Sequence, residues 1–190
     1  MLIDGDLSLK SQDGKTVSTG FYQLRQIKAI RRCLHNDVVK SLVNAFEVSR
    51  LDYCNGIYAN LSGIHLARRQ SVLNAAARLI VVVSRFEHIT QLLRYRLRWL
   101  RCPERMQFKL YVSINQAVNG MAPDYIKELC VPATVTERHL TIRSAVFNTY
   151  ILILPTRSTD TKFGDRTFRT AGPTAWNSMP VNIRQSASLG

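Results

Sequence analysis

Apolar residues recur at helical spacing in the first part of the chain. Taking 100° per residue, one broad apolar face begins near Thr16 and comprises Val17, Phe21, Leu24, Ile27, Ile30 and Leu34. The basic residues Arg25, Lys28 and Arg32 lie within about 60° of one another beside that face. The pattern predicts an amphipathic helix from Thr16 with a basic edge next to its buried stripe.

A second helix is predicted by a capping residue, a periodic apolar segment and a stop signal. Asn36 or Asp37 can cap it, because their side chains accept hydrogen bonds from the free N–H groups of a first turn. The apolar pattern continues towards Tyr53, and Asn55-Gly56 supplies the residue types that end helices. We therefore expect one helix from about residue 36 to about residue 53.

A third helix opens at Ser62 or Gly63. Its apolar face comprises Val72, Leu73, Ala76, Leu79, Ile80 and Val83. Arg78 and Arg85 are two turns apart and point away from that face, so we expect them on a polar surface.

Pro103 can start a fourth helix, which runs from Glu104 to about Val118 and should end at Asn119-Gly120. Basic residues are frequent before this helix and in its first turns. They extend the predicted basic surface and comprise Arg94, Arg98, Arg101, Arg105 and Lys109.

The residue types change beyond Pro123, where further prolines interrupt every long helix and β-branched residues become frequent. Segments 145–154 and 162–170 could pair as a β-hairpin, and Gly172-Pro173 could start a short helical turn that carries Trp176. The prediction is a mainly α fold, with a helical region at 16–130 and a C-terminal region at 131–190 that holds a small hairpin.

The chain carries a formal net charge of +13. Residues 21–110 hold 16 Lys and Arg residues against five Asp and Glu residues, and this stretch therefore contributes +11. The charge coincides with the clearest helical periodicity, so it lies on folded elements and favours a polyanionic partner such as nucleic acid.

A membrane location is disfavoured by the apolar runs, which fall far short of the ~20 residues that a spanning helix needs. The first residues include Asp4 and Asp6, unlike a basic and then apolar secretory leader. We expect an intracellular protein with free cysteine thiols, and the sequence does not distinguish nucleus from cytoplasm.

Other candidate chemistry is weak, and no cofactor or metal is predicted. Cys33 and His35 are close in sequence, but the remaining cysteines are isolated and no CxxC motif supports a zinc site. Segment 14–16 resembles the end of a phosphate-binding loop but lacks its first glycine. Trp99 and Trp176 could stack on bases, although packing is the favoured role.

Several short segments are similar to a known family. They are FYQLRQIKAIRRCL at 21–34, SRLDYCNGIYANL at 49–61, NAAARLI at 74–80, RMQFKL at 105–110, GMAPDYI at 120–126, RHLTIRSA at 138–145 and AGPTAWNSMP at 171–180. In this order they resemble the region after the polymerase palm in the endonuclease and reverse transcriptase polyproteins of non-LTR (LINE-type) retrotransposons, especially the jockey-like group.

The resemblance implies a helical thumb that grips template and primer through phosphates and groove shape, with little base reading. In that family, palm aspartates hold the two Mg²⁺ ions of DNA polymerisation. By this resemblance residues 1–15 align with the edge of the palm, past those aspartates, and the chain has no Asp-Asp pair. We expect no catalysis, and binding of RNA, DNA or an RNA–DNA hybrid by the basic residues named above.

Three alternatives stay open at this stage. The basic residues could form an ordinary solvated face; the chain could be a decayed retrotransposon copy without a selected function; or it could supply a thumb in trans to a separate palm. A missing palm would expose part of the first helix with Leu2 and Ile3, and self-association through that surface is a further expectation.

Overall fold

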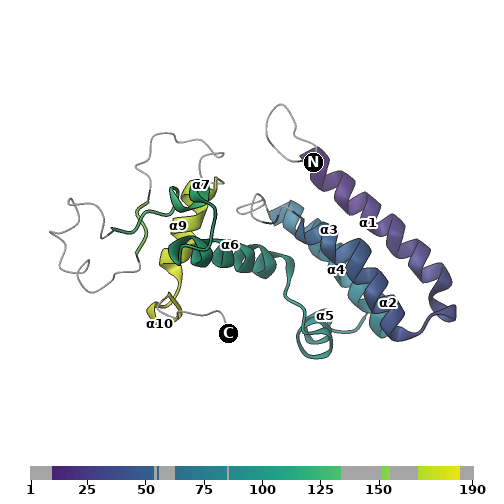
Figure 1. Ribbon diagram of the computed structural model, residues 1–190. Coiled ribbons are helices and arrows are strands. Elements are labelled where there is room, and N and C mark those ends of the chain that lie inside the picture. The colour runs from purple at the N-terminus through teal and green to yellow at the C-terminus, as the bar shows by residue number, and fades with distance from the viewer. Residues whose placement is uncertain are drawn as a thin grey trace. The chain divides into compact units, whose positions relative to one another are not determined.

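The computed structural model describes residues 10–53, 55, 63–84, 86–133, 151–154 and 167–184 (Figure 1). The helices are α1 (Lys10–Ile30), η1 (Arg31–Cys33), α2 (Asn36–Val43), η2 (Asn44–Val48), α3 (Ser49–Asp52), α4 (Gly63–Val81), α5 (Ile89–Gln91), η3 (Leu92–Leu97), α6 (Cys102–Val118), α7 (Asp124–Lys127), α9 (Phe168–Ser178) and α10 (Val181–Arg184). These described residues contain no strand, only one isolated bridge. The predicted mainly α fold is confirmed.

The chain forms two compact units, and the division falls within α6, between Arg105 and Met106. The first unit holds the helices from α1 to η3 and the first turn of α6. The second unit holds the rest of α6 with α7, α9 and α10.

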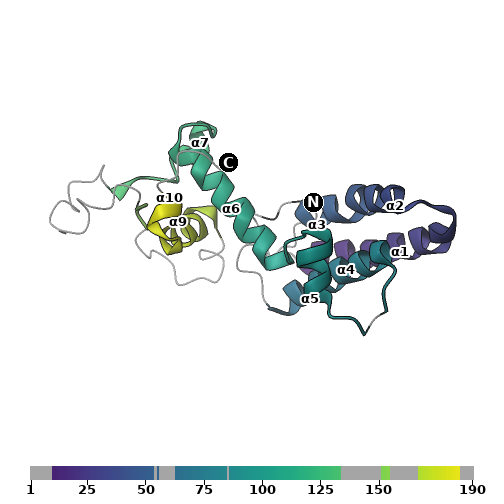
Figure 2. The same cartoon turned by 90° about the horizontal axis from the view of Figure 1, so that it is seen from below.

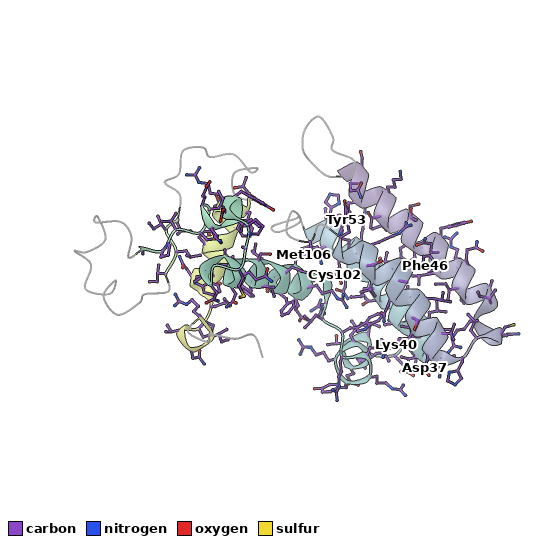
Figure 3. The ribbon with its side chains drawn as sticks, in the orientation of Figure 1. Asp37, Lys40, Phe46, Tyr53, Cys102 and Met106 are labelled. Carbon is purple, nitrogen blue, oxygen red and sulfur yellow. The ribbon has the colours of Figure 1, made fainter. Side chains whose placement is uncertain are left out.

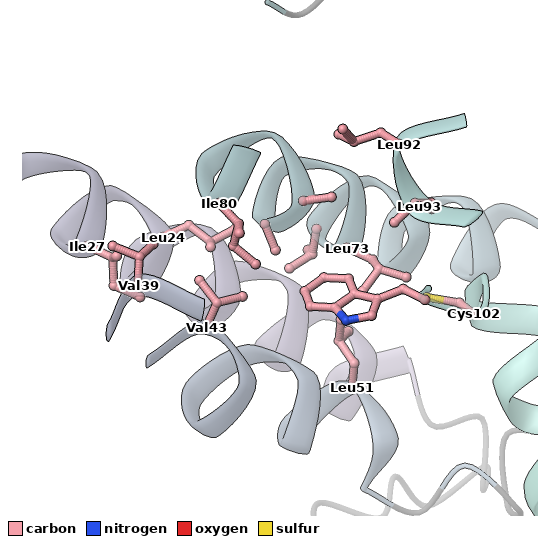
Figure 4. Packing of buried hydrophobic residues seen from close by; sticks show 14 residues of the cluster. Leu24, Ile27, Val39, Val43, Leu51, Leu73, Ile80, Leu92, Leu93 and Cys102 are labelled. Carbon is pink, nitrogen blue, oxygen red and sulfur yellow. The ribbon is translucent and has the colours of Figure 1, made fainter. Parts of the chain in front are cut away.

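The first unit is a bundle in which α1 and α2 each pack against α4 (Figures 1 and 2). Its core is formed by the predicted apolar faces of the first three helices, closed by residues of η3 and the start of α6 (Figure 4). The fully or nearly fully buried members include Leu24, Val39, Val43, Val72, Leu73, Ala76, Leu93 and Cys102. The helical periodicity therefore identified most of each packing face, but Ile30, which was predicted on the apolar face of the first helix, is 50% exposed.

Gly20 allows α1 to approach its neighbours closely. A Cβ atom at this position would lie 2.8 Å from Glu47 Oε2 and 2.9 Å from Val72 Cγ1, both shorter than real Cβ contacts. Glycine lowers helix propensity by about 1 kcal/mol relative to alanine. The close packing of α1 against α4 and η2 accounts for its presence here.

The start of the first helix was predicted wrongly. The periodicity placed its beginning near Thr16, but α1 already begins at Lys10. Asp13 is fully buried, and its carboxylate accepts a hydrogen bond from Arg69 Nε at 2.7 Å and lies 2.7 Å from His65 Nδ1. This tertiary pairing keeps a turn-forming residue inside a helix.

The predicted second helix is confirmed as the continuous path α2, η2 and α3. Its predicted cap is wrong, because the N-cap residue is His35, without a side-chain capping bond, and Asn36 and Asp37 already lie in the first turn. The segment η2 is π-helical, which widens the turn. Glu47 within it is buried against α1, whereas Phe46 and Tyr53 are exposed (Figure 3). A π-helical turn is how this helix places a carboxylate inside the bundle.

The third and fourth helices are also confirmed as α4 and α6. α4 begins at Gly63, and α6 is followed by Gly120, whose φ of 74° is the left-handed conformation expected just after a helix end. Cys102 and Met106 lie one turn apart at the start of α6 (Figure 3).

The second unit packs α9 on the later turns of α6. Trp176 is 1% exposed, and its cluster includes Leu110, Ile114 and Leu152. Trp99 is also buried, in the core of the first unit. Packing is thus the role of both tryptophans, as favoured from the sequence.

The predicted β-hairpin is not present in the described part of its two segments. Leu152 forms its bridge with Pro132 instead, and Asn177 receives and donates hydrogen bonds at the Leu152 backbone, at 3.0 and 2.8 Å. Residues 168–170, expected in a strand, form the first turn of α9. Residues 145–150 and 162–166 lie outside the described residues.

Candidate nucleic-acid interface

A groove lies between the C-terminal halves of α1 and α4 in the first unit. Its volume is about 670 Å³, and its lining comprises Phe21, Leu24, Arg25, Lys28, Arg31, Arg32, Ala75, Arg78, Leu79, Val82 and Val83. The α1 residues follow a spacing of three and four, and the α4 residues do the same, so each helix contributes one stripe. Helix packing brings the two stripes together.

Four cationic residues predicted from the sequence meet at this groove. Arg25, Lys28 and Arg32 come from α1 and its extension, and Arg78 comes from α4. Among the described residues, none forms a hydrogen bond or ion pair with these four side chains. No acidic residue belongs to the described lining. The groove is therefore a concentration of uncompensated positive charge.

Arg31 also lines the groove, and the sequence analysis missed it. Its Nε donates to the carbonyl of Leu79 at 3.2 Å, and a terminal nitrogen lies 3.4 Å from the carbonyl of Ile80. The same side chain bonds the carbonyl of Leu34 at 3.1 Å and the side chain of Asn36. Arg31 thus satisfies carbonyl groups at the end of α4 and fixes the distance between the groove walls.

Arg78 is half-buried beside α1, not on the open polar face that its spacing predicted. Its Nε is inaccessible to solvent and has no hydrogen-bond acceptor among the described residues. A buried donor without an acceptor costs about 1–3 kcal/mol. A ligand cannot supply the acceptor missing at Nε, so an anion could reach this guanidinium only at its terminal nitrogens.

The end of α4 has an unusual backbone conformation. Val82 has a φ of 57°, a left-handed value that β-branched residues rarely adopt, and its side chain is 70% exposed at the groove. Its N–H still bonds the carbonyl of Arg78 at 2.9 Å. The chain therefore presents an apolar side chain to solvent at a strained position.

A second set of predicted basic residues lies around η3 and the start of α6. Some of these side chains are exposed, and others are bonded to neighbouring residues. Arg98 and Arg101 are exposed, and Arg98 has a left-handed φ of 54°. Arg94 is also exposed, 3.3 Å from a Glu104 oxygen. The Arg101 N–H, which donates to Glu104, holds the pKa of that carboxyl below its ordinary value, and Arg94 adds to the effect.

Arg105 is partly buried and bonded to other residues of the first unit. One terminal nitrogen lies 2.7 Å from Asp52 Oδ2, and its Nε donates to the carbonyl of Leu100 at 2.9 Å. Its guanidinium carbon lies 5.8 Å from the centroid of the Trp99 ring. These contacts give Arg105 a structural role that sequence spacing did not reveal.

Two of the predicted basic residues remain. Arg85 lies outside the described residues, and Lys109 is exposed on α6 in the second unit. The described site therefore consists of the four groove residues, with Arg94, Arg98 and Arg101 as a separate exposed group.

Glu47 is a buried carboxyl of the first unit with a shifted pKa. Burial raises its pKa to about 7, and the nearby Arg50 opposes this shift only in part. Its Oε1 has no hydrogen-bond partner among the described residues. With 1% of its surface exposed, the carboxyl cannot reach a substrate, so its effect is on stability.

The described residues contain no group of three or more His, Cys, Asp or Glu side chains that could hold a metal ion. Cys33, Cys102 and Cys130 are free, and only Cys33 is exposed. Burial raises the pKa of Cys102 to about 11 and raises that of Cys130, so both thiols stay protonated near neutral pH.

Across the described helices, none is both long and apolar enough to cross a membrane. No family model matches the chain, and comparisons with curated proteins and with solved structures also give no match.

Proposed function

We propose that this chain is a non-catalytic, thumb-like part of a non-LTR retrotransposon reverse transcriptase, and that it binds RNA, DNA or their hybrid without reading sequence. The observation that carries the binding proposal is the groove between α1 and α4, where Arg25, Lys28, Arg32 and Arg78 converge without a described partner. The resemblance of the short sequence segments supports the origin.

Phosphate binding follows from how these side chains are placed. Arg25 and Lys28 are three residues apart on α1, about 4.5 Å along the helix axis, and Arg32 follows four residues later in η1. A row of cations at such intervals suits a row of phosphates, and each contact releases condensed counterions. Phosphates are the same for every base, so binding of this kind carries no sequence information.

Without an anionic ligand, the positive charges on this surface destabilise the helix that carries them. Like charges on one helix face at spacings of three and four repel one another and destabilise a helix by a few tenths of a kcal/mol per pair. Arg31 donates hydrogen bonds to carbonyl groups, whereas the neighbouring cations form none with described residues and can bind a ligand. This division of roles favours a functional groove over an ordinary solvated face.

The test is a titration of the purified chain against a labelled RNA strand, a DNA strand of the same sequence and their hybrid at several salt concentrations. Four phosphate contacts predict that log affinity falls with log salt at a slope of about −3 to −4. Circular dichroism should show a helical protein. A helical chain that binds none of the three, or binds without salt dependence, contradicts the proposal, and an unfolded product favours a decayed copy.

A further inference from the structure

We infer that the groove between α1 and α4 takes an unpaired strand in preference to a duplex, with phosphates at its cationic rim and bases on its apolar floor. The inference rests on the proposed function and specifies its ligand. The preference for an unpaired strand is argued from the apolar lining of the groove, whereas the proposal of phosphate binding is argued from the cationic residues alone.

The floor is apolar and continuous with the core. Phe21, Leu24, Ala75, Leu79, Val82 and Val83 belong to the lining, together with the cationic residues. Phe21, Leu79 and Val83 are only partly buried by the core of the first unit, so each keeps surface that a ligand could cover. An exposed apolar surface of this kind gains free energy when a ligand removes it from water.

A duplex does not supply groups that match this floor. Its bases are stacked inside, and the surface that it offers to a basic groove consists of phosphates and sugars. A strand without a partner has open base faces, which bind apolar and aromatic side chains while its phosphates contact Lys and Arg. The combination of a cationic rim with an apolar floor therefore matches a single strand in charge and in polarity.

Val82 and Arg78 place a possible apolar contact with a base next to a possible ionic contact with a phosphate. The Val82 side chain projects at the groove despite its left-handed backbone, and 70% of it is exposed. One helical turn earlier, Arg78 has a buried Nε without an acceptor among the described residues. Because Nε itself is closed to solvent, a phosphate would bind at the terminal nitrogens of Arg78 while its base covers the exposed Val82 side chain.

The experiment compares three labelled ligands of equal length at one salt concentration, with fluorescence anisotropy as the readout. They are an oligo(dT) strand, an abasic strand with the same backbone, and a duplex. We expect oligo(dT) to bind about tenfold more tightly than either other ligand, because stacking on an apolar surface contributes only when bases are free.

The variant Val82→Asn tests the contribution of the apolar lining to binding separately from that of the cationic residues. Asparagine tolerates the left-handed conformation and so keeps the end of α4 intact, which circular dichroism and the melting temperature would verify. We expect its affinity for oligo(dT) to fall about threefold, with unchanged duplex affinity and an unchanged salt slope. Val38→Asn, on an exposed position of α2 outside the groove, is the matched control and should leave all three affinities unchanged.

The outcomes of this experiment distinguish the two proposals. Equal, salt-dependent binding of strand, abasic strand and duplex would overturn the preference for a strand and leave phosphate binding intact. Displacement of oligo(dT) by polyglutamate at equal charge concentration would also overturn it, since the groove would then respond to negative charge in a peptide as well. Absence of binding to all three ligands would overturn both proposals.

Discussion

The Asp13 carboxylate lies 2.7 Å from Arg69 Nε, and this fully buried ion pair joins the beginning of α1 to α4. Arg69 also donates to the carbonyl of Leu51 at 3.3 Å, and His65 contacts the second Asp13 oxygen. The network ties three helical segments of the first unit together. It lies on the two helices whose other ends form the groove.

Replacing Asp13 should destabilise the first unit strongly. In Asp13→Asn the buried Arg69 guanidinium loses its ion pair with the Asp13 carboxylate, and breaking a buried pair of this kind costs about 3–5 kcal/mol of unfolding free energy. Urea denaturation followed by circular dichroism measures the change. Asp37→Asn is the matched control, since this aspartate is exposed and should change stability by less than about 0.5 kcal/mol. Equal effects of the two substitutions would refute the role of the pair.

Glu47 should make stability depend on pH in the range from about 4.5 to about 7. Its pKa is raised in the folded state, so the folded protein holds a proton there that the unfolded chain releases. The contribution is fully present below the unfolded value of 4.5 and is lost as pH rises to about 7. The unfolding free energy should therefore fall by roughly 3 kcal/mol across this window.

The variant Glu47→Gln isolates that effect. It removes the titrating group and keeps a similar shape, so it should be more stable than the wild type at pH 8 and nearly equal to it at pH 4.5. The measurement is the difference between the two unfolding free energies at each pH, which cancels the titration of other groups. A difference that does not change with pH would show that Glu47 does not titrate in this range.

Val82→Gly should stabilise the first unit by about 1 kcal/mol, because glycine adopts a left-handed φ without a Cβ clash. Thermal unfolding monitored by circular dichroism measures it. Val83→Gly is the matched control. Its backbone is not left-handed and its side chain is partly buried, so that change should lower stability. A loss of stability in both variants would contradict the assignment of strain to Val82.

Arg105→Gln should affect stability more than binding. The substitution removes the ion pair with Asp52, which keeps its hydrogen bond from Asn55, and also removes the bond to the Leu100 carbonyl, which together predict a loss of about 1–2 kcal/mol. Arg98→Gln, at an exposed position, is the comparison. If Arg105→Gln weakens nucleic-acid binding while the unfolding free energy is unchanged, Arg105 is a contact residue after all.

Periodicity predicted the elements well because each long helix has one consistent apolar face. It also placed Arg25, Lys28 and Arg32 correctly on one edge, since that relationship is local to a helix. Their meeting with Arg78 depends on how α1 packs on α4, and spacing within a single helix carries no information on that packing.

The missed and wrong predictions also concern packing between helices, on which spacing within one helix carries no information. Arg31 and Arg32 are adjacent and of similar chemistry, and only the position of the α4 carbonyls decides that Arg31 is the one that bonds them. Asp13 and Gly14 are typical of turns, but a buried partner on another helix outweighs that local preference. Phe168 and Thr170 have strand-forming side chains, yet residues 168–170 are helical because α9 buries Trp176 against α6.

The most direct test of the central claim compares two triple variants that remove the same charge from different places. Arg25→Gln, Lys28→Gln and Arg32→Gln remove the α1 side of the groove rim, whereas Lys15→Gln, Lys40→Gln and Arg68→Gln remove three exposed cations outside it. Affinity for a labelled strand is measured from low to moderate salt. If the groove binds phosphates, the first variant loses about one unit of salt slope per lost contact and most of its affinity, while the second keeps its slope. Equal losses in the two variants would mean that overall charge, and not this groove, holds the nucleic acid.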